Sequence, residues 1–120
     1  MPMETSTNDA RAELLQGTLD LMVLKTLEVM GPMHGFGIAR RIEQVSANAL
    51  HLNEGTVYAS LLRLRQKAWI SAKWGASENN RKARFYAITP SGRKQLQREV
   101  ENWDRTADAV VRVLGMEAEA

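Results

Sequence analysis

Apolar residues recur at intervals of three and four through the first part of the chain, which is the spacing of amphipathic helices. One such run extends from Leu15 to Met30, and Gly31 with Pro32 stops it. A second run covers residues 34–45 and repeats the spacing. The pattern therefore predicts two consecutive helices near the start of the protein.

A third helix is predicted from Asn53 to about Lys67. Asn53 stands where an N-cap is needed, because its side-chain oxygen can accept a hydrogen bond from an amide of the first turn. When the helix is projected at about 100° per residue, one side is apolar and is expected to be buried. That side consists of Val57, Leu61, Leu64 and Ala68, with Tyr58 and Leu62 on its shoulder.

The opposite side of the third helix carries mostly small or cationic residues. Small groups near the start let the backbone approach a surface closely, and the first amides favour an anion such as phosphate. Cations farther along would lie beside the phosphates of a groove wall. This distribution is typical of a recognition helix in a DNA major groove, although an ordinary solvent-exposed face also fits it. The residues on this side are Gly55, Thr56, Ala59, Arg63, Gln66 and Lys67.

Alternating apolar and polar residues predict two strands, at 70–74 and 84–88, that form a hairpin across the polar loop 75–83. Trp69 and Trp74 are expected in the core around this hairpin. The cations near its turn suit a wing that reaches phosphates or the minor groove, and a solvated basic loop is the plainer alternative. These cations are Arg81, Lys82 and Arg84.

Thr89 followed by Pro90 predicts the start of a last helix, since threonine is a good N-cap and proline suits the first helical position. We expect this helix to run to about Gly115. Its apolar residues have heptad spacing, which predicts that it pairs, together with the first helix, across a two-fold axis; packing on its own first helix is the alternative. The expected dimerisation residues are Leu15, Leu19, Leu96, Val100, Trp103, Ala107, Val110 and Leu114.

The charge of the chain is strongly segregated, although its net value is only +2. Residues 34–98 contain twelve Lys or Arg and three acids, a net of +9, so the remainder has four bases and eleven acids, a net of −7. A basic middle between acidic ends is what a polyanionic partner would select, but a solvated basic surface requires no partner.

The order of these elements is that of a winged helix-turn-helix protein. We predict a mainly α fold with a two-stranded β-hairpin, divided into a disordered tail (1–12), a winged helix-turn-helix DNA-binding domain (13–89) and a C-terminal dimerisation helix (90–115). Two recognition helices about 34 Å apart would bind a palindrome in double-stranded DNA. The alternative is a winged-helix protein–protein interaction module that binds no DNA. The predicted DNA-binding residues are Asn53, Glu54, Gly55, Thr56, Tyr58, Ala59, Arg63, Lys67, Arg81, Lys82 and Arg84.

Several classes of protein are disfavoured by the composition. The chain has no cysteine, which suits a reducing cytoplasmic compartment, and neither a secretory leader nor a membrane-spanning run is expected. His34 and His51 are the only histidines and lack metal-ligand spacing, so we expect no metal and no other cofactor. No catalytic motif occurs, and an enzyme is not expected. His34 more plausibly caps or packs beside the second helix.

Four segments resemble, in order and spacing, the PadR family of bacterial transcriptional regulators: LLQGTLDLMVLKTLE, HGFGIARRI, NEGTVYASLLRLRQKAWI and RKARFYAITPSGRKQL. The resemblance implies a dimeric winged helix-turn-helix protein, usually a repressor, sometimes relieved by a small aromatic or drug-like inducer. It also implies that Trp103 can stack on a flat ligand, although packing between subunits is the simpler role. Family members often have proline in place of Glu54 and Ala59. These departures bear on base preference, because Glu54 can accept from a cytosine amine or repel phosphate.

Overall fold

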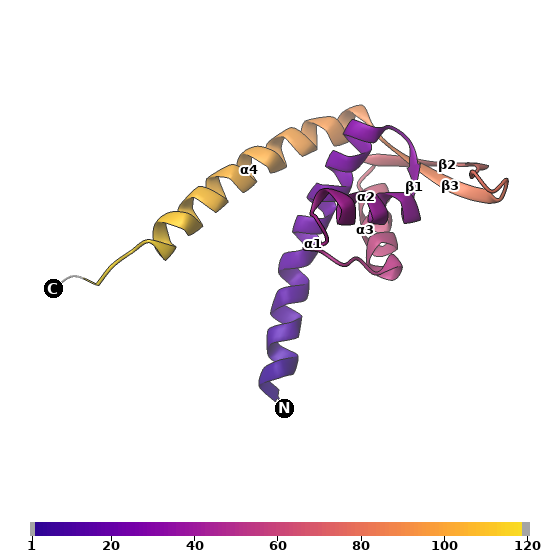
Figure 1. Cartoon of the computed structure of the whole chain (residues 1–120). Coiled ribbons are helices and arrows are strands. Elements are labelled where there is room, and N and C mark those ends of the chain that lie inside the picture. The colour runs from indigo at the N-terminus through magenta and orange to yellow at the C-terminus, as the bar shows by residue number, and fades with distance from the viewer. Residues whose placement is uncertain (1, 119–120) are drawn as a thin grey trace.

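The computed structural model describes the backbone of residues 2–118 and the side chains of residues 16–118 (Figure 1). The structure contains four helices and three short strands, and the first three helices, the hairpin and the last helix follow one another in the order expected for a winged helix. They are α1 (Pro2–Met30), β1 (Met33–His34), α2 (Gly35–Val45), α3 (Glu54–Gln66), β2 (Ile70–Ala76), β3 (Lys82–Ile88) and α4 (Pro90–Leu114).

The caps of the helices agree with those expected from the sequence. Gly31, with a φ of 79°, follows the end of α1, and the Asn53 side chain accepts a hydrogen bond from the Thr56 amide at 3.2 Å. The Thr89 hydroxyl accepts from the Gly92 amide at 3.0 Å. His34 caps α2, since its Nδ1 accepts from the Gly37 amide at 3.0 Å. Local capping chemistry therefore sets the start of three helices.

Helix α1 begins at Pro2, ahead of the first periodic apolar residues. Proline suits the first position of a helix, and no glycine or proline interrupts residues 3–16, so nothing in the backbone chemistry stops the helix there. The division of the chain into a tail (1–12), a DNA-binding domain (13–89) and a dimerisation helix (90–115) stays a prediction.

The sheet has three strands rather than the two predicted, in the order β1-β3-β2 with antiparallel pairing throughout. β1 contributes two residues, and Met33 pairs with Tyr86. A two-residue strand is too short to show alternation, so it leaves no signal in the sequence. β2 and β3 also continue past their predicted ends to Ala76 and Lys82, which shortens the loop of the wing to residues 77–81.

One core holds the helices and the sheet together. The core contains buried residues from all four helices and from β2 and β3. Helix α1 contacts the other three helices and β3, so it lies at the centre of the domain. The members of the core are Leu19, Val23, Leu24, Leu27, Ile38, Ala39, Ile42, Val57, Leu61, Leu64, Ile70, Tyr86 and Leu96.

The two predicted core tryptophans have different environments. Trp69 is partly buried and packs against the core, as expected. Trp74 is 56% exposed, so its placement in the core was wrong. It lies on the part of β2 that extends beyond the helices into the wing, where the sheet has no layer to cover it.

Helix α4 starts against the domain and then leaves it. In its first turn, a Cβ on Gly92 would lie 2.0 Å from the Trp69 carbonyl oxygen, so only glycine permits this close approach. Farther on, α4 runs away from the domain as a single helix, on the side opposite the wing (Figure 1). The described molecule is correspondingly elongated, with extents of 66 × 38 × 28 Å.

Candidate nucleic-acid interface

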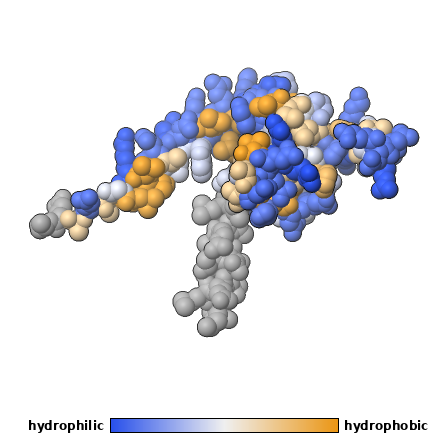
Figure 2. All heavy atoms as spheres, viewed as in Figure 1, coloured by the Kyte–Doolittle hydropathy of each residue, from blue (hydrophilic) through white to orange (hydrophobic). Residues whose placement is uncertain are grey.

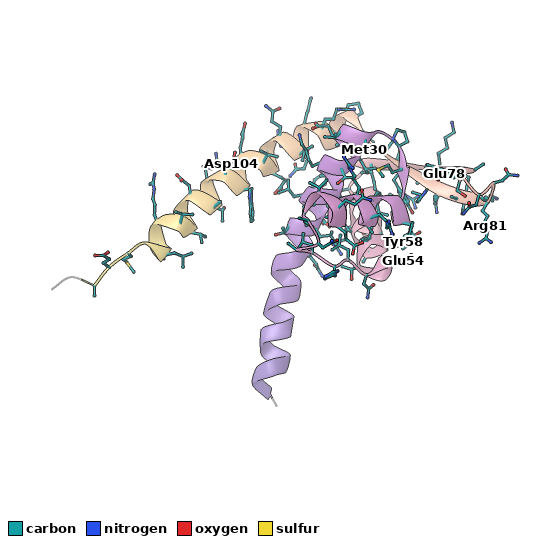
Figure 3. The ribbon with its side chains drawn as sticks, viewed as in Figure 1. Met30, Glu54, Tyr58, Glu78, Arg81 and Asp104 are labelled. Carbon is teal, nitrogen blue, oxygen red and sulfur yellow. The ribbon has the colours of Figure 1, made fainter. Side chains whose placement is uncertain are left out.

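The side of α3 predicted to face a ligand is on the surface. Gly55, Thr56 and Ala59 are all exposed, while Val57 and Leu64 on the other side are fully buried. Glu54 and Tyr58 lie at the same outer part of the domain in Figure 3. The first turns of α3 therefore expose backbone and small side chains to solvent, and their contact with DNA stays a prediction.

Arg63 is placed differently from its prediction as a DNA-binding cation. Its Nη2 donates to Asp20 Oδ1 at 2.7 Å, and its Nε donates to Asp20 Oδ2 at 3.1 Å. Ser60, fully buried, donates to the same carboxylate at 2.6 Å. Asp20 belongs to α1, so the three side chains join α1 to α3, and the fork geometry of the guanidinium favours this two-bond pairing. The positive charge of Arg63 is therefore paired with Asp20 inside the domain.

Three outward residues of α3 were not among the predicted site residues, and they are Leu62, Arg65 and Gln66. Leu62 was expected on the shoulder of the buried side but is 55% exposed, and Arg65 is exposed beside it. The exposure of Leu62 agrees with a projection centred on the buried Val57, Leu61 and Leu64, which places Leu62 on the outer side of the helix, so its assignment to the shoulder of the buried side was wrong. The burial of Ser60 has a different cause, because its hydrogen-bond acceptor Asp20 lies on α1.

Tyr58 is held in a defined position at the edge of α3. Its ring lies against Gly35, where an added Cβ would be 3.0 Å from two ring carbons. The residue is still 48% exposed, so its outer edge faces solvent. A tyrosine that packs on one side and is open on the other can present its hydroxyl to a phosphate without paying much rotamer entropy.

The wing carries the predicted cations, and Trp74 organises two of them. Lys82 Nζ lies 4.9 Å from the centre of the Trp74 ring and Arg84 Cζ lies 5.3 Å from it, which is the range of cation–π contacts. Arg81 is exposed at the tip of the wing (Figure 3). Figure 2 shows that hydrophilic residues dominate this end of the molecule.

A groove of about 900 Å³ separates the wing from helices α2 and α3. Its charged lining contains four cations and one acid, Glu78. Arg40 of α2 belongs to this lining and was not predicted; its guanidinium lies 5.9 Å from the centre of the half-exposed Phe36 ring. The four cations are Arg40, Arg81, Lys82 and Arg84. The groove is thus electropositive, and it lies beside α3.

Lys67, another predicted DNA contact, is exposed at the C-cap of α3. Its ammonium lies 4.7 Å from the centre of the Trp69 ring, so the side chain folds back over the start of β2. At the other end of α3, Glu54 is exposed in the first turn, where a carboxylate interacts favourably with the helix dipole.

Comparison with known proteins identifies the family. Residues 23–98, more than half of the chain, match the transcriptional regulator PadR-like family. The chain belongs to this family. Its backbone is similar to that of a transcriptional regulator from Clostridium thermocellum, with 25% identity and a TM-score of 0.75 over 83% of this chain and 96% of that one. The PadR-like fold is that of a DNA-binding transcriptional regulator, not of an enzyme.

Two further relatives are uncharacterized. A protein X of Lysinibacillus sphaericus is 27% identical over 100 residues, which cover 83% of this chain and 91% of the relative. A 37.1 kDa protein from a Streptomyces fradiae transposon is 33% identical over 104 residues, covering 87% of this chain but 26% of the relative. The PadR-like chain thus spans about a quarter of that larger protein.

The predicted dimerisation residues of this PadR-like chain fall into two groups. Leu19 and Leu96 are 2% exposed within one protomer, so their assignment to a dimer interface was wrong. They belong to the core because α1 and the first turns of α4 pack on each other there. Leu15 lies outside the residues whose side chains are described. The remaining residues, Val100, Trp103, Ala107, Val110 and Leu114, are exposed or partly exposed along α4.

Trp103 borders a hollow of about 530 Å³ between α1 and α4 of the PadR-like protomer. The ring is 49% exposed, and Gly17 and Leu21 of α1 line the other wall.

The part of the PadR-like chain that the structure describes contains neither a cluster of metal ligands nor a membrane-spanning helix. No three acidic, histidine or cysteine side chains of residues 16–118 gather closely enough to hold a metal ion. Within the same described part, no helix is both long and apolar enough to cross a bilayer.

Proposed function

We propose that the chain is a homodimeric transcriptional repressor that binds a palindromic operator and responds to a small aromatic ligand. The single observation that carries the proposal is the exposed apolar stripe on α4. Val100, Trp103 and Val110 are 38%, 49% and 48% exposed, and Leu114 is 80% exposed. Their heptad spacing is that of a helix that packs along another helix.

The distal half of α4 supports assembly because no side chain among residues 16–118 covers it. Figure 2 shows hydrophobic residues gathered on one side of its far end. A hollow of about 440 Å³ along this half is lined by Val110, Val113 and Leu114 together with Arg105, Thr106 and Ala109. Such an unpaired apolar stripe is expected to be buried in a solution complex, and a second copy supplies the matching stripe by symmetry.

A palindromic operator follows from a two-fold dimer. Each protomer offers one α3 and one wing, and a two-fold axis presents them to opposite half-sites. Recognition helices about 34 Å apart would enter successive major grooves on one side of the duplex. The exposed cations Arg65, Arg81 and Lys82 would lie beside phosphates, so binding should weaken steeply as salt is added.

The proposed ligand response rests on the hollow beside Trp103. A flat aromatic molecule stacked on this ring would contact α1 and α4 at once. Because α1 also holds α3 through Asp20, a shift of α1 against α4 would alter how α3 is presented to DNA. Repression is the simplest outcome of operator occupancy close to a promoter, and the ligand would relieve it.

The experiment compares two single substitutions on neighbouring positions of α4. Val110→Glu places a charge in the stripe, whereas Val111→Glu, at a position 67% exposed and outside the heptad spacing, is the matched control. Sedimentation equilibrium should give a dimer for the natural chain and for Val111→Glu and a monomer for Val110→Glu. In a reporter strain carrying the chain's own promoter region, only Val110→Glu should lose repression. A natural chain that stays monomeric at micromolar concentration would overturn the proposal.

A further inference from the structure

We propose that Ala59 and Leu62 form a contact surface for the C5-methyl groups of thymine, so that the chain selects half-sites with thymine opposite the middle of α3. The inference rests on the proposed binding to operator DNA and names the chemical feature that is recognised. It makes Leu62, which was expected on the shoulder of the buried side and which the resemblance to the family did not select, a specificity-determining residue.

The outermost line of α3 is formed by four residues spaced four, three and four apart. They fall within about 60° on the helix projection, directly opposite the buried Val57 and Leu64. Leu62 is 55% exposed on this line, and Ala59 is exposed one turn earlier. The four residues are Gly55, Ala59, Leu62 and Gln66.

The chemistry of this line limits how bases can be recognised. Arginine, asparagine and glutamine are the side chains that form paired hydrogen bonds with base edges. On this line, the one such side chain is Gln66, the last residue of α3, while the Arg63 guanidinium on the flank is bound to Asp20 at 2.7 Å. The middle of this outermost line therefore offers apolar contact, and the exposed Arg65 lies on its flank rather than on the line itself. The thymine methyl is the apolar group that base pairs present in the major groove.

The surroundings of Leu62 favour nucleic acid over an apolar protein surface. Arg65 is exposed on one flank of the line, and Lys67 is exposed on the other. The groove beside α3 adds the cations of α2 and the wing. An apolar protein partner would have to desolvate these charges, whereas a duplex supplies phosphates for them on both walls of the major groove.

The test uses thymine and uracil, which have the same hydrogen-bonding groups and differ by the C5-methyl. The whole chain is first used to enrich sequences from a pool of random-sequence duplexes. Each thymine of an enriched duplex is then replaced singly by deoxyuridine, and affinities are measured by fluorescence anisotropy at one salt concentration. Burial of one methyl group corresponds to about a fourfold change in affinity. We expect a loss of about threefold to fivefold at one or two thymines in each half-site.

Variants assign the effect to side chains. Leu62→Ser should abolish the difference between thymine and uracil at one of these positions, and Ala59→Gly should reduce it at the neighbouring one. Gln66→Ala is the matched control, because it lies on the same line but is polar; it should change affinity without changing the thymine-to-uracil ratio. All three residues are exposed, so folding should be preserved, and circular dichroism would verify it.

The outcomes separate this inference from the proposed function. Enriched duplexes that tolerate uracil at every position within twofold, or a Leu62→Ser variant that keeps the thymine-to-uracil ratio, would overturn the thymine contact while leaving operator binding intact. If Leu62→Ser instead changes the sedimentation behaviour of the free protein, Leu62 belongs to a protein interface and the inference is overturned. If no sequence is enriched, operator binding itself fails and the thymine contact falls with it.

Discussion

Substitution of Asp20 by alanine should destabilise the protein well beyond the loss of a surface charge. The carboxylate accepts three hydrogen bonds, from Ser60 Oγ at 2.6 Å and from Arg63 at 2.7 and 3.1 Å. Without it, the fully buried Ser60 hydroxyl has no acceptor, at a cost of about 1–3 kcal/mol. The ion pair is about a quarter exposed on the Arg63 side, which limits its contribution to about 1 kcal/mol. The expected loss is about 2–4 kcal/mol.

Urea unfolding at fixed protein concentration measures this loss, and a double substitution tests its cause. The midpoint should fall by about 1–2 M urea in Asp20→Ala. Ser60→Ala should destabilise the natural chain by about 1 kcal/mol but stabilise the Asp20→Ala variant, because it removes the orphaned hydroxyl. Asp108→Ala, which breaks an exposed pair with Arg112, should stay within about 0.5 kcal/mol. If Ser60→Ala is equally destabilising in both backgrounds, the argument is refuted.

Substitutions at three further positions test two close backbone approaches and one helix cap. Gly92→Ala should lower stability by about 3 kcal/mol or more, because its Cβ would lie 2.0 Å from the Trp69 carbonyl oxygen; a thermal midpoint within a few degrees of the natural protein would contradict this. Gly35→Ala should displace the Tyr58 ring and weaken binding to duplex in an anisotropy titration, and unchanged affinity would show that the ring position does not matter. Asn53→Ala should cost about 1 kcal/mol in urea unfolding, whereas Asn53→Ser should cost little; equal losses would argue against the cap.

The helices could be predicted from the sequence because the signals that define them are local. Asn53 and Thr89 cap the helices that follow them, and Gly31 ends the one before it, each within a few residues of the boundary. Periodicity adds the buried side of each helix, although Leu62 in α3 and Ala68 beyond its end, expected on or beside this side, are exposed. The winged helix-turn-helix order follows from these local features alone.

Misplaced residues trace to contacts between distant parts of the chain. Ser60 and Asp20 are separated by 40 positions, so the sequence of α3 alone cannot show that Ser60 is buried against Asp20 or that Arg63 is paired with it. Strand β1 is similar, because its two residues show no alternation and their pairing partners, Tyr86 and Phe85, lie more than 50 positions farther along the chain. These three-dimensional contacts decide which cations and apolar groups face a ligand.

The apolar stripe on α4 is a second case in which the sequence pattern does not show which contacts a residue makes. A heptad pattern identifies an apolar side but not what covers it. Leu96 follows the pattern as well as Val110 does, yet the former is buried in its own protomer and the latter is about half exposed. The difference depends on where α4 leaves the domain, which is fixed by its packing at Gly92 rather than by the helix itself.

The central claim is that two copies bind one duplex through α3 and the wing, and the salt dependence of binding tests it most directly. Affinity for an enriched duplex is measured between about 50 and 200 mM salt for the natural chain and for a variant with Arg81→Ala and Lys82→Ala. Four cations would be lost per dimer, so the slope of log K against log salt should decrease in magnitude by about 3.6. Sedimentation of the complex should give two chains per duplex. An unchanged slope, or one chain per duplex at every protein concentration, would contradict the account.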